Sequence, residues 1–128
     1  MIRPFVKYLD YWVISKWFES YNLKAIPIES MPDHGYVFED DNGLQGFVGI
    51  YLTNSNVAWA EYLIVKPGLK NPKRNEVLKD IFDAGINYCR VNGLVLLSLS
   101  NDDKITTRLI KSGFVSSFKG LELLSLGG

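Results

Sequence analysis

The sequence predicts one α/β (α+β) domain built on a mixed, mostly antiparallel sheet. Three strand-like segments follow one another between residues 35 and 65, separated by short turns, which is the pattern of an antiparallel meander. The stretch from Val57 to Ser100 then reads as strand, amphipathic helix and strand, the pattern of a βαβ unit with parallel strands. The 128 residues are enough for a real core but not for two, so we expect a single domain over residues 1–128.

Charge and composition exclude several classes of protein. The 14 basic and 14 acidic residues give a net charge of zero, which argues against a protein whose main task is to bind nucleic acid. One cysteine excludes an internal disulfide framework and is typical of a reducing compartment. One histidine and one cysteine without clustered ligand spacing argue against a metal site. No apolar run approaches the ~20 residues of a membrane span, and the first residues lack signal-peptide features. We expect a cytoplasmic protein.

The first third of the chain predicts a strand, a helix and a long connection. Ile2 to Lys7 is a short strand, where Pro4 suits an edge position. A helix follows Asp10, because large apolar residues recur at helical spacing: Trp12, Val13, Ile14, Trp17, Phe18 and Tyr21. Its many aromatic rings indicate that it covers a sheet face. Asn22 to His34 is the connection, and the lone His34, placed in a turn, is expected to be a surface residue.

The meander comes next. Gly35 to Glu39 is a strand, and the turn Asp40-Asp41-Asn42-Gly43 leads into a returning strand from Leu44 to Thr53. After the turn Asn54-Ser55-Asn56, the third strand runs from Val57 to Val65. This last strand is almost continuously apolar, as expected for a strand that is covered on both faces.

Glu61 interrupts that apolar strand. In a regular strand one face carries Trp59, Glu61, Leu63 and Val65, and the other carries Ala58, Ala60, Tyr62 and Ile64. A carboxylate in such a run is costly to bury unless it is paired or protonated. Glu61 therefore lies in a wet cleft, meets a partner or has a raised pKa. A functional carboxylate and a structural ion pair at the strand opening both remain open.

The long helix begins at Asn71-Pro72 or at Asn75, is clear from Val77, and ends at Asn92-Gly93. Its apolar stripe consists of Val77, Leu78, Ile81, Phe82, Ile86, Tyr88 and Cys89. Cys89 on this stripe is expected to be inert. Gly85 weakens a helix by about 1 kcal/mol relative to Ala, so we expect close packing on the sheet there.

The C-terminal part predicts a strand from Leu94 to Leu99 and a short helix that begins at Asn101 or Asp102 and stops at Gly113. A final hairpin is expected, with strands Phe114–Phe118 and Leu121–Leu126.

This order of elements resembles the GNAT superfamily of acyl-CoA-dependent N-acyltransferases over nearly the whole chain. The motifs that carry the resemblance are Ile2-Arg3-Pro4, Tyr62-Leu63-Ile64-Val65-Lys66-Pro67, Tyr88 with Asn92-Gly93, and Arg108-Leu109-Ile110-Lys111-Ser112-Gly113-Phe114. The chain also looks like small GNAT-like proteins encoded by bacteriophages, through Gly46-Phe47, Tyr51-Leu52-Thr53 and Glu61-Tyr62-Leu63. The resemblance implies a GNAT-like mixed, mostly antiparallel central sheet with helices on both faces.

The resemblance also implies an acetyl-CoA site. In the family, strands four and five splay apart and backbone groups of strand four pair with the pantetheine arm, a role that would fall to Leu63, Ile64 and Val65. The phosphates lie on a loop reading Arg/Gln-x-x-Gly-x-Gly/Ala at a helix N-terminus. This loop corresponds to Lys73, Arg74, Asn75, Glu76, Val77 and Leu78, where Lys73 is basic but Glu76 and Leu78 replace both glycines. The cations Lys66, Lys70, Lys73 and Arg74 could compensate. Asn101 would lie near the pantetheine.

As a function, the resemblance implies an acetyl-CoA-dependent N-acetyltransferase acting on a small-molecule or peptide amine. Glu61 would be the base that takes the proton of the amine, because acetylation needs a neutral nucleophile. Many members also protonate the leaving thiolate with a tyrosine of the helix after strand five. Leu109 holds that position here, so water or Asn101 would have to serve.

A non-catalytic GNAT-like binding or interaction protein, of phage origin for example, is the alternative. The loss of both loop glycines and of the helix tyrosine favours it. An exposed aromatic patch from Trp12, Trp17 or Trp59 would support it. A homodimer formed through the last strands is also left open.

Overall fold

The computed structural model describes residues 1–98 and 103–116 of the chain, and in them one five-stranded sheet has the order β1-β2-β3-β4-β5. The strands are β1 (Ile2–Pro4), β2 (His34–Asp40), β3 (Gly43–Leu52), β4 (Val57–Val65) and β5 (Val95–Leu97). The first four pair antiparallel with their neighbours, while β4 and β5 are parallel. The mixed, mostly antiparallel sheet, the meander and the βαβ unit are therefore confirmed.

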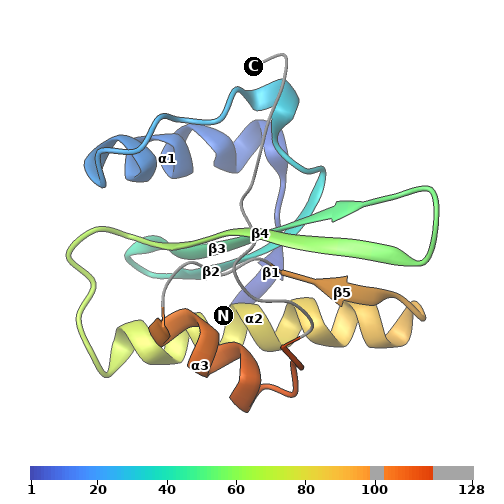
Figure 1. Cartoon of the computed structure of the whole chain (residues 1–128). Helices are drawn as coiled ribbons and strands as arrows, with labels where there is room; N and C mark the ends of the chain where they lie inside the picture. The colour runs from blue at the N-terminus through green and yellow to red at the C-terminus, as the bar shows by residue number, and fades with distance from the viewer. Residues whose placement is uncertain (99–102, 117–128) are drawn as a thin grey trace.

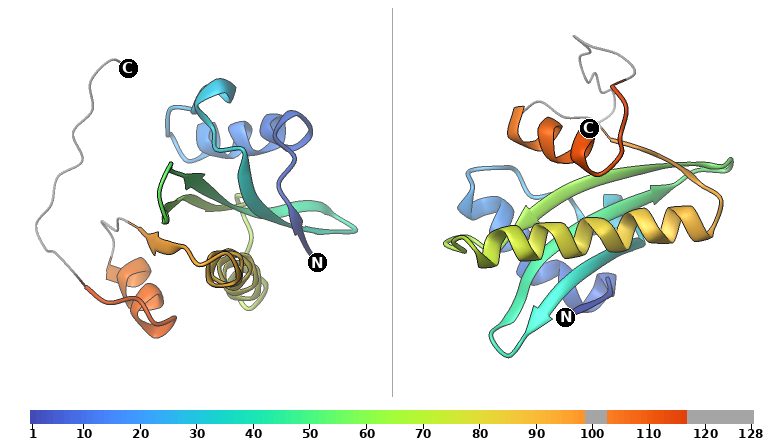
Figure 2. Two further views of the ribbon diagram at one scale, coloured as in Figure 1. Left: turned by 90° about the vertical axis from the view of Figure 1, so that its right-hand side faces the viewer. Right: turned by 90° about the horizontal axis from the view of Figure 1, so that it is seen from below.

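Helices cover both faces of this sheet. Helix α1 (Lys7–Ser20) lies across one face, while α2 (Lys73–Val91) and the shorter α3 (Asp103–Lys111) lie on the other (Figures 1 and 2). A short 3-10 turn, η1 (Ile28–Ser30), lies in the connection between α1 and β2. This layering confirms the predicted fold class. Within the described residues, no helix is long and apolar enough to cross a membrane.

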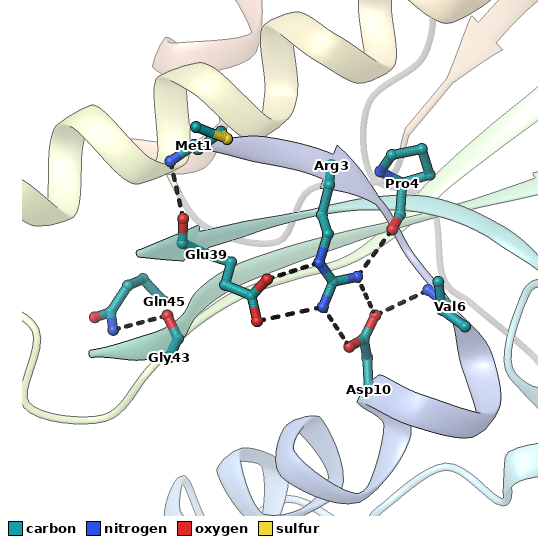
Figure 3. A network of polar contacts seen from close by, with 8 residues as sticks. All are labelled: Met1, Arg3, Pro4, Val6, Asp10, Glu39, Gly43 and Gln45. Atoms are coloured by element: carbon teal, nitrogen blue, oxygen red, sulfur yellow. Dashed lines mark hydrogen bonds and ion pairs between the residues drawn. The ribbon is translucent and has the colours of Figure 1, made fainter. Parts of the chain in front are cut away.

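The start of α1 is determined by a buried ion pair. The helix begins at Lys7, so the prediction that Asp10 precedes it was wrong. Asp10 is 2% exposed and accepts two hydrogen bonds from the Arg3 guanidinium, at 2.7 and 2.9 Å, and one from the Val6 amide at 2.8 Å. Arg3 also binds Glu39 of β2 at 2.9 Å (Figure 3). A carboxylate that is fully paired in this way can be buried in the first turn of a helix.

The rest of α1 packs by apolar contact. Its inner side joins one buried cluster with the sheet and the loop after it, formed by Phe5, Tyr11, Ile14, Trp17, Phe18, Met31, Val37, Leu44, Phe47 and Ile64. Its outer side is also apolar: Tyr8 is 80% exposed, Leu9 67% and Trp12 60%. Of the three tryptophans, Trp17 is buried, Trp59 half-buried and Trp12 exposed.

Helix α2 lies very close to β3. The predicted stripe is buried over Val77, Leu78, Ile81, Phe82 and Cys89, while Ile86 and Tyr88 are half-buried. Gly46 of β3 makes this approach possible, because a Cβ there would collide with Cγ1 of Val77. Gly85 is different: a Cβ there would lie 3.6 Å from Cδ1 of Ile50, an ordinary contact. Gly85 is buried against the sheet, as expected, but this packing leaves room for a methyl group and does not require a glycine.

The predicted turns agree with the structure better than the predicted strand ends do. Gly43 in the β2–β3 turn and Gly93 after α2 both have positive φ, +92° and +67°, as predicted for a hairpin turn and a helix cap. β1 stops at Pro4, and β5 has three residues instead of six. Residues 114–116 form no strand, and the rest of the predicted hairpin lies outside the described residues, as do Asn101 and Asp102.

Candidate active site

A cleft opens where β4 and β5 separate. The two strands pair at three positions, the last of them Trp59 with Leu97, and from Ala60 onward β4 has no β5 partner in the described residues. The volume of the cleft is about 590 Å³. Its walls come from the end of α1, from β4, from the start of α2 and from α3; they are lined by Phe18, Tyr21, Leu23, Val48, Ala60, Glu61, Tyr62, Leu63, Ile64, Val65, Arg74, Leu78, Phe82, Ser98 and Leu109.

A β-bulge lies in the middle of this cleft. Gly49 of β3 pairs with Glu61 and Phe47 pairs with Ile64, so one residue of β3 faces two of β4, Tyr62 and Leu63. Tyr62 has φ +61°, which is uncommon for an aromatic residue. Bulges of this kind bend a strand and redirect its side chains, often beside active sites.

The bulge corrects the predicted alternation of β4. Before it, Ala58 and Ala60 pack on the α2 side. After it, Leu63 and Val65 are on that side, while Tyr62 and Ile64 pack with the α1 cluster. The prediction that Ala60 and Tyr62 share a face was therefore wrong, because the extra residue shifts the alternation by one position. The consecutive residues Glu61 and Tyr62 both come to lie on the α1 side.

Glu61 lies in the cleft as a half-buried carboxylate. Burial alone raises its pKa, since no cation of the described residues acts on it. This favours the functional alternative over the structural ion pair. Its carboxylate also acts on Tyr51, whose pKa is raised first by burial and then by its contact with Tyr62.

The hydroxyl groups of Tyr51 and Tyr62 meet on the α1 side of the sheet. The Tyr51 hydroxyl lies 2.6 Å from the carbonyl oxygen of Ser30 and 2.9 Å from the Tyr62 hydroxyl. The Tyr62 ring packs edge-to-face against Phe18, with ring centroids 5.9 Å apart, and against Tyr51 at 5.8 Å. The connection after α1 is thereby joined to the bulge of β4.

The other end of the cleft is at the start of α2. Residues 73–78, to which the resemblance assigns the phosphate loop, form the first turns of α2, which begins at Lys73, between the two predicted starts. The amides of Arg74 and Glu76 are bonded to the carbonyls of Lys70 and Pro72. Arg74 lines the cleft and is exposed.

Two of the predicted binding residues face elsewhere. Lys73 lies between Asp40 at 3.5 Å and Glu76 at 3.7 Å, and 4.5 Å above the Phe38 ring. Val77 is fully buried against Gly46. Asn75 is exposed and accepts a hydrogen bond from Arg108 of α3 at 3.1 Å. Arg108, which had no predicted role, thus adds a second guanidinium group beside Arg74 at this end.

The structure brings Glu61, Leu63, Ile64, Val65 and Arg74 together in one cleft, as the sequence analysis expected. Leu109 also lines the cleft. It holds the position at which the family that the chain resembles often has a tyrosine. Asn101 lies outside the described residues. Sequence reasoning missed Phe18 and Tyr21, which it assigned to core packing, and Tyr62. Their only signal was their aromatic character, which core residues share.

Within the described residues, no three His, Cys, Asp or Glu side chains are grouped so that they could hold a metal ion. His34 is exposed and its ring stacks with that of Tyr88 at 6.1 Å, so the prediction of a surface histidine is confirmed. Cys89 is buried, and burial raises the pKa of its thiol. Neither residue lines the cleft.

Known structures share this architecture although the sequences have diverged. No family model matches the sequence, and no curated protein matches it. The Trypanosoma brucei acetyltransferase Tb11.01.2886 matches with TM-score 0.73 and 13% identity over 98% of this chain and 99% of that one. An acetyltransferase of the GNAT family from Staphylococcus aureus gives TM-score 0.66 and 14% identity over 96% and 94%.

A third match was solved with a ligand. Rv2747 from Mycobacterium tuberculosis, in complex with CoA and NLQ, gives TM-score 0.68 and 14% identity over 84% of this chain and 69% of that one. Identities at this level establish the fold. The sheet order, the helices on both faces and the divergence of β4 from β5 lead to one conclusion: this chain has the fold of the GNAT acyltransferases.

Proposed function

We propose that the protein is an acetyl-CoA-dependent N-acetyltransferase that acts on a small-molecule or peptide amine. The observation that carries this proposal is the position of Glu61. Its carboxylate is half-buried, has a raised pKa and no ionic partner in the described residues, and lies in the cleft between two diverging strands. Groups with these properties in a cleft are candidates for acid–base chemistry.

The cleft suits a thioester with a long amide-containing arm. After Trp59, β4 has no strand partner on its β5 side in the described residues, so the backbone groups there that no side chain engages can bond to an extended ligand as another strand would. The Tyr21 hydroxyl already donates to the Val65 carbonyl, so a ligand would share or displace that contact. Leu63, Ile64 and Val65 would supply these groups. The CoA complex of the Mycobacterium tuberculosis neighbour supports a ligand of this kind.

The phosphates would lie at the start of α2, near Arg74, Asn75 and Arg108. The missing glycines prevent the closest approach of phosphate to backbone. The positive end of the helix dipole and the two guanidinium groups would replace that contact with charge. Lys73 contributes less in this proposal, because Asp40 and Glu76 already hold its ammonium group.

Glu61 supplies the base of the reaction. It accepts a proton from the amine, whose nitrogen then attacks the thioester carbonyl; the new C–N bond forms as the C–S bond breaks, and the sulfur leaves as a thiolate. Burial raises the pKa of Glu61 above its ordinary value of 4.5, which brings it closer to the working pH of a general base.

Calorimetry of the full chain with acetyl-CoA tests the binding part of the proposal, and thiol release tests the reaction. The acceptors would be n-butylamine, a lysine-containing peptide and a peptide with a free N-terminus. We expect binding, and thiol release with at least one acceptor. No binding of acetyl-CoA would overturn the proposal. Binding without thiol release from any acceptor would instead favour the non-catalytic alternative.

A further inference from the structure

The sulfur that leaves the thioester as a thiolate has to take up a proton to become the thiol product, and the described part of the cleft contains few groups that could give one. Four of its lining residues, apart from Glu61, carry a proton on oxygen or nitrogen: Tyr21, Tyr62, Arg74 and Ser98. Leu109 carries none. The question is therefore which of these four has a proton that no other group already uses.

Three of these four residues are excluded as the proton donor by their contacts or their chemistry. The Tyr21 hydroxyl donates to the carbonyl of Val65 at 2.9 Å, and the Ser98 hydroxyl lies 3.4 Å from the carbonyl of Ala60. Carbonyl oxygens only accept, so both protons are held by β4 itself. Arg74 does not give up a proton in proteins. Tyr62 is left.

The Tyr62 proton can be free because of Tyr51. Within the described residues, Tyr51 is the hydrogen-bond partner of the Tyr62 hydroxyl, at 2.9 Å. Tyr51 has one proton, which it can give either to the Ser30 carbonyl or to the Tyr62 oxygen. When it donates to Tyr62, the proton of Tyr62 has no acceptor in the described residues and can be given to a ligand in the cleft.

We propose that Tyr62 is a second catalytic residue, the acid that protonates the leaving sulfur, and that Tyr51 is its positioning residue; this rests on the acetyl transfer proposed above. As the C–S bond breaks, the sulfur takes the proton of the Tyr62 hydroxyl. The phenolate oxygen that remains accepts the hydrogen bond of Tyr51. Glu61, which holds the proton of the amine, returns it to Tyr62, so both side chains end the cycle as they began.

The local geometry supports this pairing of residues. The bulge places the consecutive side chains of Glu61 and Tyr62 on the same side of β4, so a base and an acid are neighbours. The left-handed φ of Tyr62 is the kind of backbone strain that is retained mainly at functional sites. Burial raises the pKa of Tyr51, which keeps that hydroxyl protonated and able to donate.

The test compares Tyr62→Phe and Tyr51→Phe with the wild-type chain. Tyr11→Phe is the matched control, since it also removes a hydroxyl bonded to a carbonyl in the α1 layer, that of Ile26 at 2.6 Å, but does not line the cleft. The measurements are the Kd for acetyl-CoA by calorimetry and the turnover at saturating acetyl-CoA by thiol release, with n-butylamine or water as acceptor, both at neutral pH.

For Tyr62→Phe we expect a Kd within about twofold and a turnover reduced about 100-fold at neutral pH. For Tyr51→Phe we expect a smaller loss of turnover, again without a comparable change in Kd, because the Tyr62 hydroxyl remains but loses the hydrogen bond that positions it. Tyr11→Phe should keep both the Kd and the rate.

A Tyr62→Phe chain with wild-type turnover at saturating acetyl-CoA would overturn the inference. So would an equal loss in Tyr11→Phe, which would mean lost stability and not lost chemistry. A wild-type chain that does not bind acetyl-CoA at all would overturn the proposed function first, and the binding measurement distinguishes the two failures.

Discussion

The two sides of the sheet hold the cleft in different ways. On the α1 side, polar contacts fix the elements: Arg3 binds the buried Asp10, and Tyr51 joins the Ser30 carbonyl to Tyr62. On the α2 side, apolar contact fixes the helix, with Val77 seated on Gly46, while the cations of its first turn stay exposed or only partly buried.

In the proposed function, this difference separates the residues that transfer protons from the residues that attract the ligand. Glu61 and Tyr62 lie on the side where hydrogen bonds fix direction, which proton transfer requires. In the proposed function, Arg74 and Arg108 lie on the other side and attract the phosphates by charge, Arg74 from an exposed position and Arg108 from a half-buried one bonded to Asn75. Changes on the α1 side should therefore affect turnover or the folding of that layer, and changes on the α2 side should affect affinity.

Loss of Glu61 tests the α1 side most directly. Glu61→Gln keeps the size of the side chain but cannot accept the amine proton, so we expect turnover to fall by about 10²- to 10⁴-fold. Steady-state rates at saturating acetyl-CoA would measure this. The Kd for acetyl-CoA should change little, and a comparable rise in Kd would contradict the separation.

The raised pKa of Glu61 also predicts how the stability of the fold depends on pH. Between the ordinary pKa of 4.5 and the higher folded-state value, the folded chain binds more protons than the unfolded chain. The free energy of unfolding should therefore fall as pH rises through that window. Urea unfolding of wild type and Glu61→Gln at several pH values measures the difference, and the variant should lack this decrease.

Asp10 tests how much the α1 layer depends on its ion pair. Asp10→Asn leaves Arg3 with one carboxylate partner, Glu39. It also weakens the hydrogen bonds between Arg3 and residue 10, whose side chain is 2% exposed in the wild type. We expect a loss of about 3 kcal/mol in the free energy of unfolding. Lys79→Gln is a suitable control, since its ion pair with Asp83 is exposed and should contribute under 1 kcal/mol. Equal effects of the two changes would contradict the structural role of Asp10.

Two glycines test the apolar contact of α2. Gly46→Ala should destabilise the chain by about 1–3 kcal/mol, because the new methyl collides with Val77. Gly85→Ala should stabilise it by about 0.5–1 kcal/mol, because its methyl fits against Ile50 and Ala favours the helix. Thermal unfolding of both variants provides the comparison. A stabilised Gly46→Ala chain would mean that α2 does not lie so close to β3.

The cations at the start of α2 should have the smallest effects. Arg74→Gln should weaken acetyl-CoA binding about fivefold, which is about 1 kcal/mol for an exposed charge. Lys73→Gln should weaken it less, because Asp40 and Glu76 already engage that ammonium group. Calorimetry at two salt concentrations would check both, since the Arg74 effect should shrink as salt increases. A larger effect of Lys73 would reverse the assignment.

Much of the architecture could be predicted because its signals are local. Helical spacing located α2 and its buried stripe, Gly43 and Gly93 located a turn and a helix end, and the succession of strands predicted the meander. The position of Glu61 in an apolar strand pointed to the cleft before its walls were known. These features depend on residues close together in the chain.

The predictions that the structure corrects have a common cause, which is contact between residues far apart in the chain. Asp10 could be buried in a helix only because Arg3 reaches it, and Lys73 turns from the cleft because Asp40 of a distant strand attracts it. The bulge at Tyr62 has no sequence signal, since neither a glycine nor an asparagine marks its left-handed backbone. Each depends on a partner that periodicity cannot show.

The sequence by itself determined the fold class and one catalytic candidate, because hydrophobic periodicity and an isolated carboxylate act through local rules. Only the tertiary structure decided which groups meet Glu61. The pairing of β3 with β4 inserts one extra residue after it, and that single shift turns Tyr62 toward the same side. Side-chain direction in a strand has a period of two, so a one-residue irregularity decides which chemistry a cleft contains.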